Sequence, residues 1–235
     1  MMGKIVALGG GNFESGEMTD VAKHIVELAG KKEPRLLFLP TASFDRPCED
    51  SPVLKVFSGL GCTSRILYLT HEDATEDVIA LALTNSDIIY VDGGNLQFLM
   101  DTLKSTHADK YLRKAHENGA VLCGQSSGAM CWFKEGYDDC GENHSFMFYD
   151  CLDFIPYTSC PHYQSPSWQT FETAIKGRAL SGVAMDNGAA FCRVDGKYYT
   201  ICGSEGGSCY FYNKNDGFRK INLTETPSAL DMLVK

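Results

Sequence analysis

Short, unbroken apolar segments alternate with helical segments through the first two thirds of the chain, and this alternation restricts the fold more than any other feature. Five apolar segments have the length and the β-branched or aromatic content of strands: residues 4–10, 35–42, 65–70, 87–94 and 120–126. Helical periodicity separates them at residues 18–28, 52–60, 75–83 and 96–103, with a continuation to residue 118. Strands that lack polar alternation are buried on both faces. The pattern therefore predicts an α/β fold with a mainly parallel central sheet and helices on both of its faces.

The last third of the chain has a different pattern. A helix is predicted over residues 166–176, followed by strands over 182–194, 196–202 and 207–213. The VDGK segment at 194–197 is typical of a tight β-hairpin, so we expect these strands to be antiparallel and to extend the central sheet. No linker or internal repeat is evident. We therefore predict a single domain over residues 1–235, with a separate C-terminal domain as the alternative.

Charge and composition argue against several classes of protein. The formal net charge is −9 and the chain has no basic patch, which argues against a nucleic-acid partner. The N-terminal apolar segment is too short for a signal peptide or a membrane span, so we expect a cytosolic protein without a membrane partner. The ten cysteines are scattered and form no CxxC pair. We expect buried thiols, and we predict neither a metal site nor another cofactor.

Two adjacent serines lie between a predicted strand and a predicted helix, in the segment LCGQSSGAMCWF. A sharp turn from strand to helix presents a serine hydroxyl only if the residues two before and two after it are very small. Ser126 has Gly124 and Gly128 at these positions, whereas Ser127 has the larger Gln125 before it. Ser126 is therefore the candidate nucleophile. The N–H of Ser127, at the start of the helix, is a candidate donor of an oxyanion hole.

A serine nucleophile needs a general base, and the chain has six histidines. Three of them lie within helical segments, where surface or packing roles are usual: His24, His107 and His116. His162 lies in the segment TSCPHYQSP, a proline-bounded loop directly after a predicted strand. Loops that follow strands often carry functional side chains, which makes His162 the favoured base.

The motifs YVDGGNLQFL, VLCGQSSGAMCWF and CPHY occur in this order, and together they are specific. With them, the chain resembles the family of serine peptidases that comprises peptidase E, an aspartyl dipeptidase, and cyanophycinase. The resemblance extends over nearly the whole chain, from GGGN near the start to GVAMDNGAAF. It implies a fold similar to that of class I glutamine amidotransferases.

The resemblance also implies roles for individual residues. Ser126 matches the family's nucleophile and His162 its general base, while the N–H groups of Gly94 and Ser127 match the two oxyanion donors. Ser127 stands where the family usually has alanine, a change that we expect to be tolerated because the donor is the backbone N–H. Three neighbouring residues are expected to contact the substrate: Gly93, Asn95 and Gln125.

The third member of the triad is less well defined. The family places an Asp or Glu some 13 to 18 residues after the nucleophile, in a loop of variable length. The segment KEGYDDCGEN supplies four candidates: Glu135, Asp138, Asp139 and Glu142. Asp139 lies 13 residues after Ser126 and fits the members with shorter loops best. We expect its carboxylate to orient the imidazole of His162 and to stabilise the imidazolium.

Substrate specificity is expected to differ from that of peptidase E, which selects aspartate with an arginine just after the PH motif. Here the first cations after that motif are Lys176 and Arg178, and neither matches, which argues against aspartyl specificity. We therefore predict a serine peptidase or amidohydrolase that acts on a small peptide, a dipeptide being one candidate, through an acyl-enzyme on Ser126. Its oligomeric state is left open, with a homodimer as one option.

Alternatives from other classes stay open. The same fold can serve binding without catalysis, or it can support an amidotransferase-like enzyme with a cysteine nucleophile. Cys123 is a poor nucleophile candidate because it lies within a predicted strand rather than in the turn. A nucleotide-binding role for GGGNFESG is disfavoured, because the segment lacks the third glycine of the dinucleotide fingerprint and the chain has no GK[ST] phosphate loop.

Overall fold

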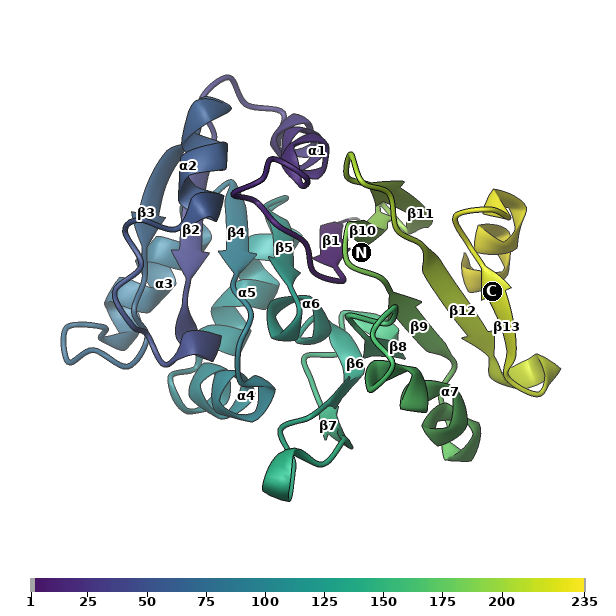
Figure 1. Ribbon diagram of the computed structural model, residues 1–235. Coiled ribbons are helices and arrows are strands. Elements are labelled where there is room, and N and C mark those ends of the chain that lie inside the picture. Colours follow the sequence, from purple (N-terminus) through teal and green to yellow (C-terminus); the bar gives the residue numbers. More distant parts are fainter. Residues whose placement is uncertain (1–2, 235) are drawn as a thin grey trace.

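The central sheet has seven strands in the order β11-β10-β1-β5-β4-β2-β3. The computed structural model describes residues 3–234 and is shown in Figure 1. The strands of this sheet are β1 (Lys4–Leu8), β2 (Arg35–Leu39), β3 (Thr63–Ile66), β4 (Ile88–Val91), β5 (Val121–Gln125), β10 (Ala189–Val194) and β11 (Lys197–Cys202). Neighbours from β1 to β3 are parallel, while β10 and β11 are added antiparallel. The predicted parallel sheet and its antiparallel extension are both confirmed.

Helices cover both faces of this sheet (Figure 1). One face carries α1 (Thr19–Ala29) and α2 (Pro52–Gly59), and the other carries α3 (Glu76–Thr84), α4 (Leu96–Ser105) and α5 (Ala108–Glu117). Successive strand residues alternate between the two cores: Val6 and Leu8 pack with α1 and α2, and Ile5 and Ala7 pack on the opposite face. None of the helices within residues 3–234 has the length and apolarity of a membrane span.

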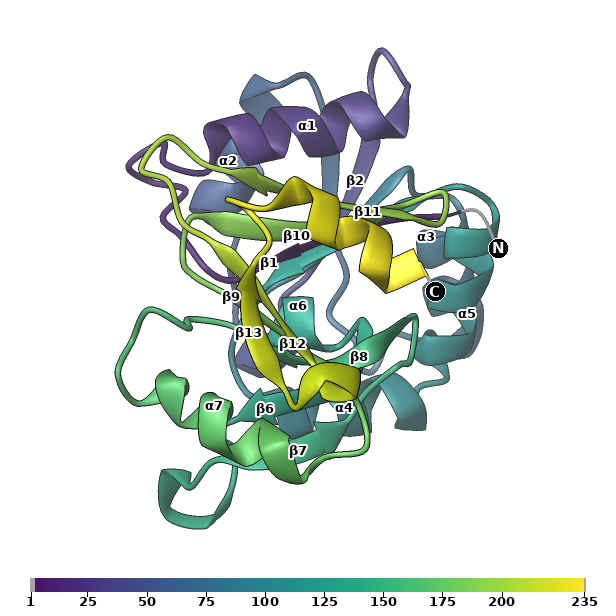
Figure 2. The same ribbon diagram turned by 90° about the vertical axis from the view of Figure 1, so that its right-hand side faces the viewer.

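A second sheet of six strands packs beside the first, in the order β13-β12-β9-β8-β6-β7. Its strands are β6 (Phe133–Asp138), β7 (Met147–Asp150), β8 (Ile155–Cys160), β9 (Gly182–Met185), β12 (Cys209–Asn213) and β13 (Arg219–Asn222). Two short helices accompany it, α6 (Ser127–Met130) and α7 (Phe171–Ala174). Short 3₁₀ helices span Thr41–Ser43, Glu142–His144, Trp168–Thr170, Ile175–Gly177, Lys214–Asp216 and Pro227–Val234. Figure 2 shows this sheet and α1 on opposite sides of β1 and β10.

The second sheet differs from the expected simple extension of the first. Residues 182–194, predicted as one strand, form β9 and β10, which belong to different sheets and are joined by a turn at residues 186–188. The predicted hairpin at 194–197 is confirmed, because β10 and β11 pair directly around Asp195 and Gly196, both at positive φ. One hydrophobic core nevertheless contains residues of both sheets, among them Leu122 of β5 and Phe211 of β12.

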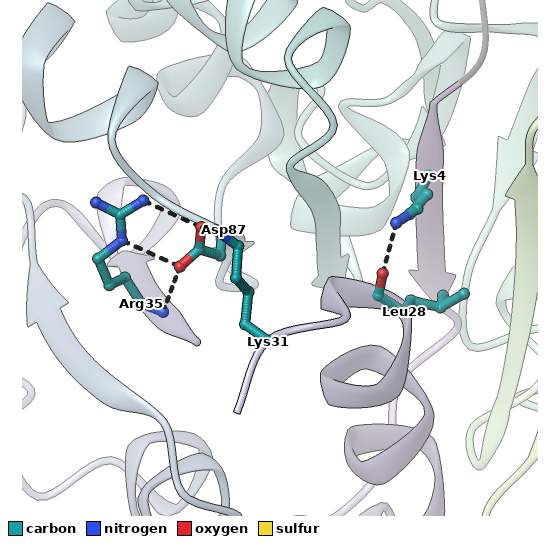
Figure 3. Close-up of polar contacts among 5 residues, drawn as sticks. All are labelled: Lys4, Leu28, Lys31, Arg35 and Asp87. Atoms are coloured by element: carbon teal, nitrogen blue, oxygen red, sulfur yellow. Dashed lines mark hydrogen bonds and ion pairs between the residues drawn. The ribbon is translucent and has the colours of Figure 1, made fainter. Parts of the chain in front are cut away.

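Polar contacts hold the amino ends of the central strands together (Figure 3). Arg35, at the start of β2, donates from Nε and Nη2 to the Asp87 carboxylate just before β4, at 3.0 Å each. The hydrogen bond from this guanidinium lowers the pKa of Asp87. Lys4 of β1 donates to the carbonyl of Leu28 in α1. This edge of the sheet is stabilised by its own side chains, and the loops at the carboxyl ends of the strands are the ones left to form a site.

Candidate active site

Ser126 occupies a strained turn between β5 and α6. Its backbone lies at φ 54° and ψ −120°, a conformation that is unfavourable for a residue with a side chain. Its N–H donates to the carbonyl of Leu8 at the end of β1, which helps to hold the turn at the carboxyl edge of the sheet. Figure 1 shows α6 directly after β5, facing the second sheet. Strain of this kind is typical of a nucleophile elbow.

The two glycines around Ser126 are required by close backbone contacts. A Cβ atom on Gly124 would lie 2.4 Å from the carbonyl oxygen of Val91, and one on Gly128 would lie 2.0 Å from the same atom. Real Cβ atoms essentially never approach that closely. The observed turn therefore requires the two glycines that distinguish Ser126 from Ser127 in the sequence.

His162 lies beside Ser126, although 36 residues separate them in the chain. It follows β8, and its Nε2 is 2.8 Å from the Ser126 hydroxyl. The N–H of His162 donates to the carbonyl of Gly9, which ties this loop to the end of β1. The ring of Trp168 meets the imidazole edge-on, with 5.3 Å between ring centroids. The structure thus brings together the predicted nucleophile and the predicted base.

Asn187 is the second partner of the imidazole. Its Oδ1 lies 2.6 Å from Nδ1 of His162, so Nδ1–H donates to the amide oxygen and Nε2 is left to accept from Ser126. Asn187 lies in the turn between β9 and β10, and its N–H donates to Oε1 of Gln164, two residues after His162. Gly10 packs directly against the pair, because a Cβ there would lie 2.1 Å from Oδ1 of Asn187.

The structure does not pair Asp139 with His162 as expected, because Nδ1 of the imidazole is bonded to Asn187. The residue lies in the loop between β6 and β7, where it is exposed and lines a cavity together with Gly94. The other three candidates also have different surroundings. Glu135 accepts hydrogen bonds from Arg178, Asp138 is buried, and Glu142 is exposed. Loop length in the sequence does not determine which strand ends meet, and here β8 and the β9–β10 turn meet.

The expected oxyanion donors lie on two neighbouring loops. Within residues 3–234, neither the N–H of Gly94 nor that of Ser127 donates to a backbone carbonyl. Their role as oxyanion donors stays a prediction. The Ser127 side chain is fully buried, and its hydroxyl donates to the Gly94 carbonyl at 2.7 Å. This bond connects the two loops and accounts for a serine at the position where alanine was expected.

The three predicted substrate contacts have defined structural surroundings. Gly93 lies next to the nucleophile, since a Cβ there would be 3.7 Å from Ser126 Oγ. The Asn95 side chain caps α4 by accepting from the N–H of Phe98. Gln125 donates from Nε2 to Asp92, whose pKa is raised by burial, and Oε1 of Gln125 has no partner among the described residues. Substrate contact by these residues stays a prediction.

The model of peptidase family S51 matches residues 5–201, which is most of the chain. The chain belongs to peptidase family S51. Among its relatives is the uncharacterized peptidase YgaJ of Bacillus subtilis, 31% identical over 211 residues and covering 88% of this chain and 90% of that protein. The uncharacterized peptidase Lin0382 of Listeria innocua is 31% identical over 162 residues, covering 63% of this chain and 76% of that protein.

Solved structures share the fold of this S51 family member. A peptidase from an acI-B1 actinobacterium superposes with a TM-score of 0.75 at 19% identity, covering 95% of each chain. A putative peptidase E protein from Listeria monocytogenes gives a TM-score of 0.67 at 21% identity, covering 87% of this chain and 100% of that one. The family and its relatives make this chain a peptidase, and hence a hydrolase.

Cys123 is buried in this S51 peptidase and lies away from the turn. Its side chain is fully inaccessible within β5, its thiol donates to the carbonyl of Ile89, and burial raises its pKa well above the usual range. A thiol in such surroundings is a poor nucleophile, which argues against the cysteine-dependent alternative. Across residues 3–234, no group of three or more His, Cys, Asp or Glu side chains is arranged to hold a metal ion.

The first two cations after His162 in the sequence, Lys176 and Arg178, have different surroundings in the structure. Arg178 forms an ion pair with Glu135 at 2.6 Å and lies over the ring of Phe148, whereas Lys176 is exposed. Both Nε and Nη2 of Arg178 donate to the Glu135 carboxylate, so this guanidinium already has an acidic partner within the protein. These contacts agree with the sequence-based argument against aspartyl specificity.

Proposed function

We propose that this S51 family member is a serine peptidase that cleaves small peptides through an acyl-enzyme on Ser126. The observation that supports the proposal is the continuous chain of hydrogen bonds from the Ser126 hydroxyl through His162 to Asn187, with 2.8 Å and 2.6 Å between the bonded atoms. A hydroxyl on a strained elbow, bonded to an oriented imidazole, is the arrangement that nucleophilic acyl transfer requires.

The reaction follows from this geometry. As Ser126 Oγ attacks the peptide carbonyl carbon, its proton passes to Nε2 of His162, and the carbonyl oxygen becomes an oxyanion that the N–H groups of Gly94 and Ser127 stabilise. The C–N bond then breaks, and the leaving amine takes the proton from Nε2. Water then attacks the acyl-enzyme ester, with His162 as its base, and the carboxylic acid and free Ser126 are released.

Asn187 acts as the third member in this proposal. An amide oxygen keeps the proton on Nδ1 and leaves Nε2 as the acceptor, which is the orienting part of the task that a carboxylate performs in serine proteases. Being uncharged, it gives the imidazolium weaker electrostatic stabilisation than a carboxylate would. Cysteine proteases of the papain type use the same His–Asn pairing, so the arrangement is chemically competent.

The proposal is tested with a library of dipeptides and an active-site label. A neutral fluorophosphonate should modify Ser126, and the modified peptide should be identified by mass spectrometry. Ser126→Ala should lose the label and reduce kcat/KM by on the order of 10⁴-fold or more. Ser127→Ala should keep the label, with a smaller loss of rate. Loss of activity in Ser127→Ala, with activity retained in Ser126→Ala, would refute the assignment.

A binding protein without catalysis is the competing function. It predicts peptide binding with no turnover and no reaction between the wild-type protein and the fluorophosphonate. The observed elbow favours catalysis, because a strained strand-to-helix turn of this kind is the arrangement that presents a nucleophilic hydroxyl. Labelling of the wild-type protein distinguishes the two functions directly.

A further inference from the structure

The turn that carries Asn187 is held by hydrogen bonds from its backbone N–H groups. Those of Asp186, Gly188 and Ala189 donate to backbone carbonyls. The N–H of Asn187 instead donates to a side chain, to Oε1 of Gln164 at 2.8 Å. The N–H with a side-chain acceptor therefore belongs to the residue whose own side chain orients the imidazole.

Gln164 connects this turn to the loop of the general base. It lies two residues after His162, so the two segments meet at two hydrogen bonds: Nδ1 of the imidazole to Oδ1 of Asn187 at 2.6 Å, and the Asn187 N–H to Gln164. The second bond fixes the backbone from which the Asn187 side chain extends. Because the Gln164 side chain is exposed, changing it leaves no cavity in the core. We therefore expect that its hydrogen bond can be removed without loss of the fold.

An amide acceptor makes the position of this turn critical. A carboxylate offers two oxygens, so it can rotate after a small shift and still accept from Nδ1–H. The Asn187 amide offers one oxygen, and its NH₂ group is a donor that would face the Nδ1 proton after such a rotation. Displacements of about 1 Å within a catalytic group are already costly in rate. An Asn as the third member of the triad therefore requires a backbone that is held more firmly than an Asp would require.

We propose that Gln164 is a positioning residue for the acyl transfer. Its carboxamide oxygen holds the backbone of Asn187, and through Asn187 it holds the tautomer and the direction of the His162 imidazole. Nδ1 of His162 bonds Asn187 and Nε2 bonds the nucleophile, so the effect of Gln164 passes through Asn187. This inference rests on the proposed function, because it concerns the general base of the same site.

Matched variants of Gln164 test the role of its oxygen. Gln164→Met nearly keeps the length of the side chain and removes the acceptor, whereas Gln164→Glu keeps an oxygen that accepts from the Asn187 N–H. We expect Gln164→Met to lower kcat about 10-fold with KM changed by less than about twofold, and Gln164→Glu to keep kcat within about twofold of wild type. Gln169→Met is the control, because Gln169 is also exposed and makes none of the contacts of the Asn187 turn. Wild-type kcat in Gln164→Met, or an equal loss in Gln164→Glu or Gln169→Met, would overturn the proposal.

A double-mutant cycle tests whether Gln164 acts through Asn187. Asn187→Ala removes the side chain that Gln164 positions, so Gln164→Met should cause no further loss of kcat/KM in that background. A loss that adds to that of Asn187→Ala would overturn the proposal, because Gln164 would then act elsewhere. Urea unfolding of the same samples shows whether each variant is folded, and the comparison of Gln164→Met with Gln164→Glu decides alone if Asn187→Ala is not.

Labelling of wild-type Ser126 by a neutral fluorophosphonate is measured in parallel, because it separates the two proposals. Failure of this labelling refutes the proposed function. Intact labelling together with wild-type turnover in Gln164→Met refutes the positioning role of Gln164 alone.

Discussion

Replacing Gly10 with alanine tests whether the position of the His162–Asn187 pair controls turnover. Gly10 packs against both side chains, and a Cβ there would lie 2.1 Å from Oδ1 of Asn187 and 2.7 Å from Cε1 and Nδ1 of His162. Ordinary contacts of a Cβ atom begin near 3.4 Å, so the amide oxygen must retreat by about 1 Å. The substitution therefore breaks the orienting hydrogen bond without changing any of the three polar side chains.

The size of the effect follows from this displacement. A misplacement of about 1 Å within a catalytic group costs about 10²-fold in rate, so kcat/KM should fall by roughly that factor. Gly10 also lies at φ +142°, where an alanine is strained by about 1–3 kcal/mol. Stability must therefore be measured beside activity, by urea unfolding of the same samples.

Gly30→Ala provides the matched control. Gly30 ends α1 at φ +64° with no other atom within 4 Å of an added Cβ, so alanine there adds backbone strain far from the site. We expect a loss of stability of about 1 kcal/mol with kcat/KM unchanged. The reasoning fails if folded Gly10→Ala retains kcat/KM within twofold of wild type, or if Gly30→Ala loses as much activity.

The remaining predictions concern the imidazole, a buried histidine and metals. Asn187→Ala should lower kcat/KM by about 10²-fold. Asn187→Asp should keep activity and move the acidic limb of the pH–rate profile to higher pH, because a carboxylate stabilises the imidazolium. An acidic limb that does not move in Asn187→Asp would contradict the assignment. Burial lowers the pKa of His116 from 6.5 to about 4, so its contribution to stability is complete above pH 6.5 and is lost as pH falls toward 4. Unfolding measured at pH 7 and pH 4 should show that the wild type loses about 3 kcal/mol relative to His116→Gln over this range, and parallel losses would refute it. Exhaustive chelation should leave the rate of peptide cleavage unchanged, and activity restored by an added divalent ion would show that a metal is needed.

Much of the fold and half of the site could be predicted from local sequence. Unbroken apolar segments identified strands buried on both faces, because a strand with one solvated face would alternate apolar and polar residues. Gly124 and Gly128 selected Ser126 because the steric demands of an elbow act within five consecutive residues. The proline-bounded loop after a strand identified His162. Each of these signals depends only on residues that are close in the sequence.

The partner of His162 was decided by tertiary structure. The DNG sequence at 186–188 is a turn signal within an apolar segment, and reading it as such would have divided the segment into two strands. Even then, only the pairing of β9 with the second sheet and of β10 with β1 brings Asn187 to the imidazole. Asp139 has the expected spacing but lies on another wall of the site. Distance along the chain does not specify distance in space, because the choice depends on which strands pair, and that choice is made by burial of the whole core.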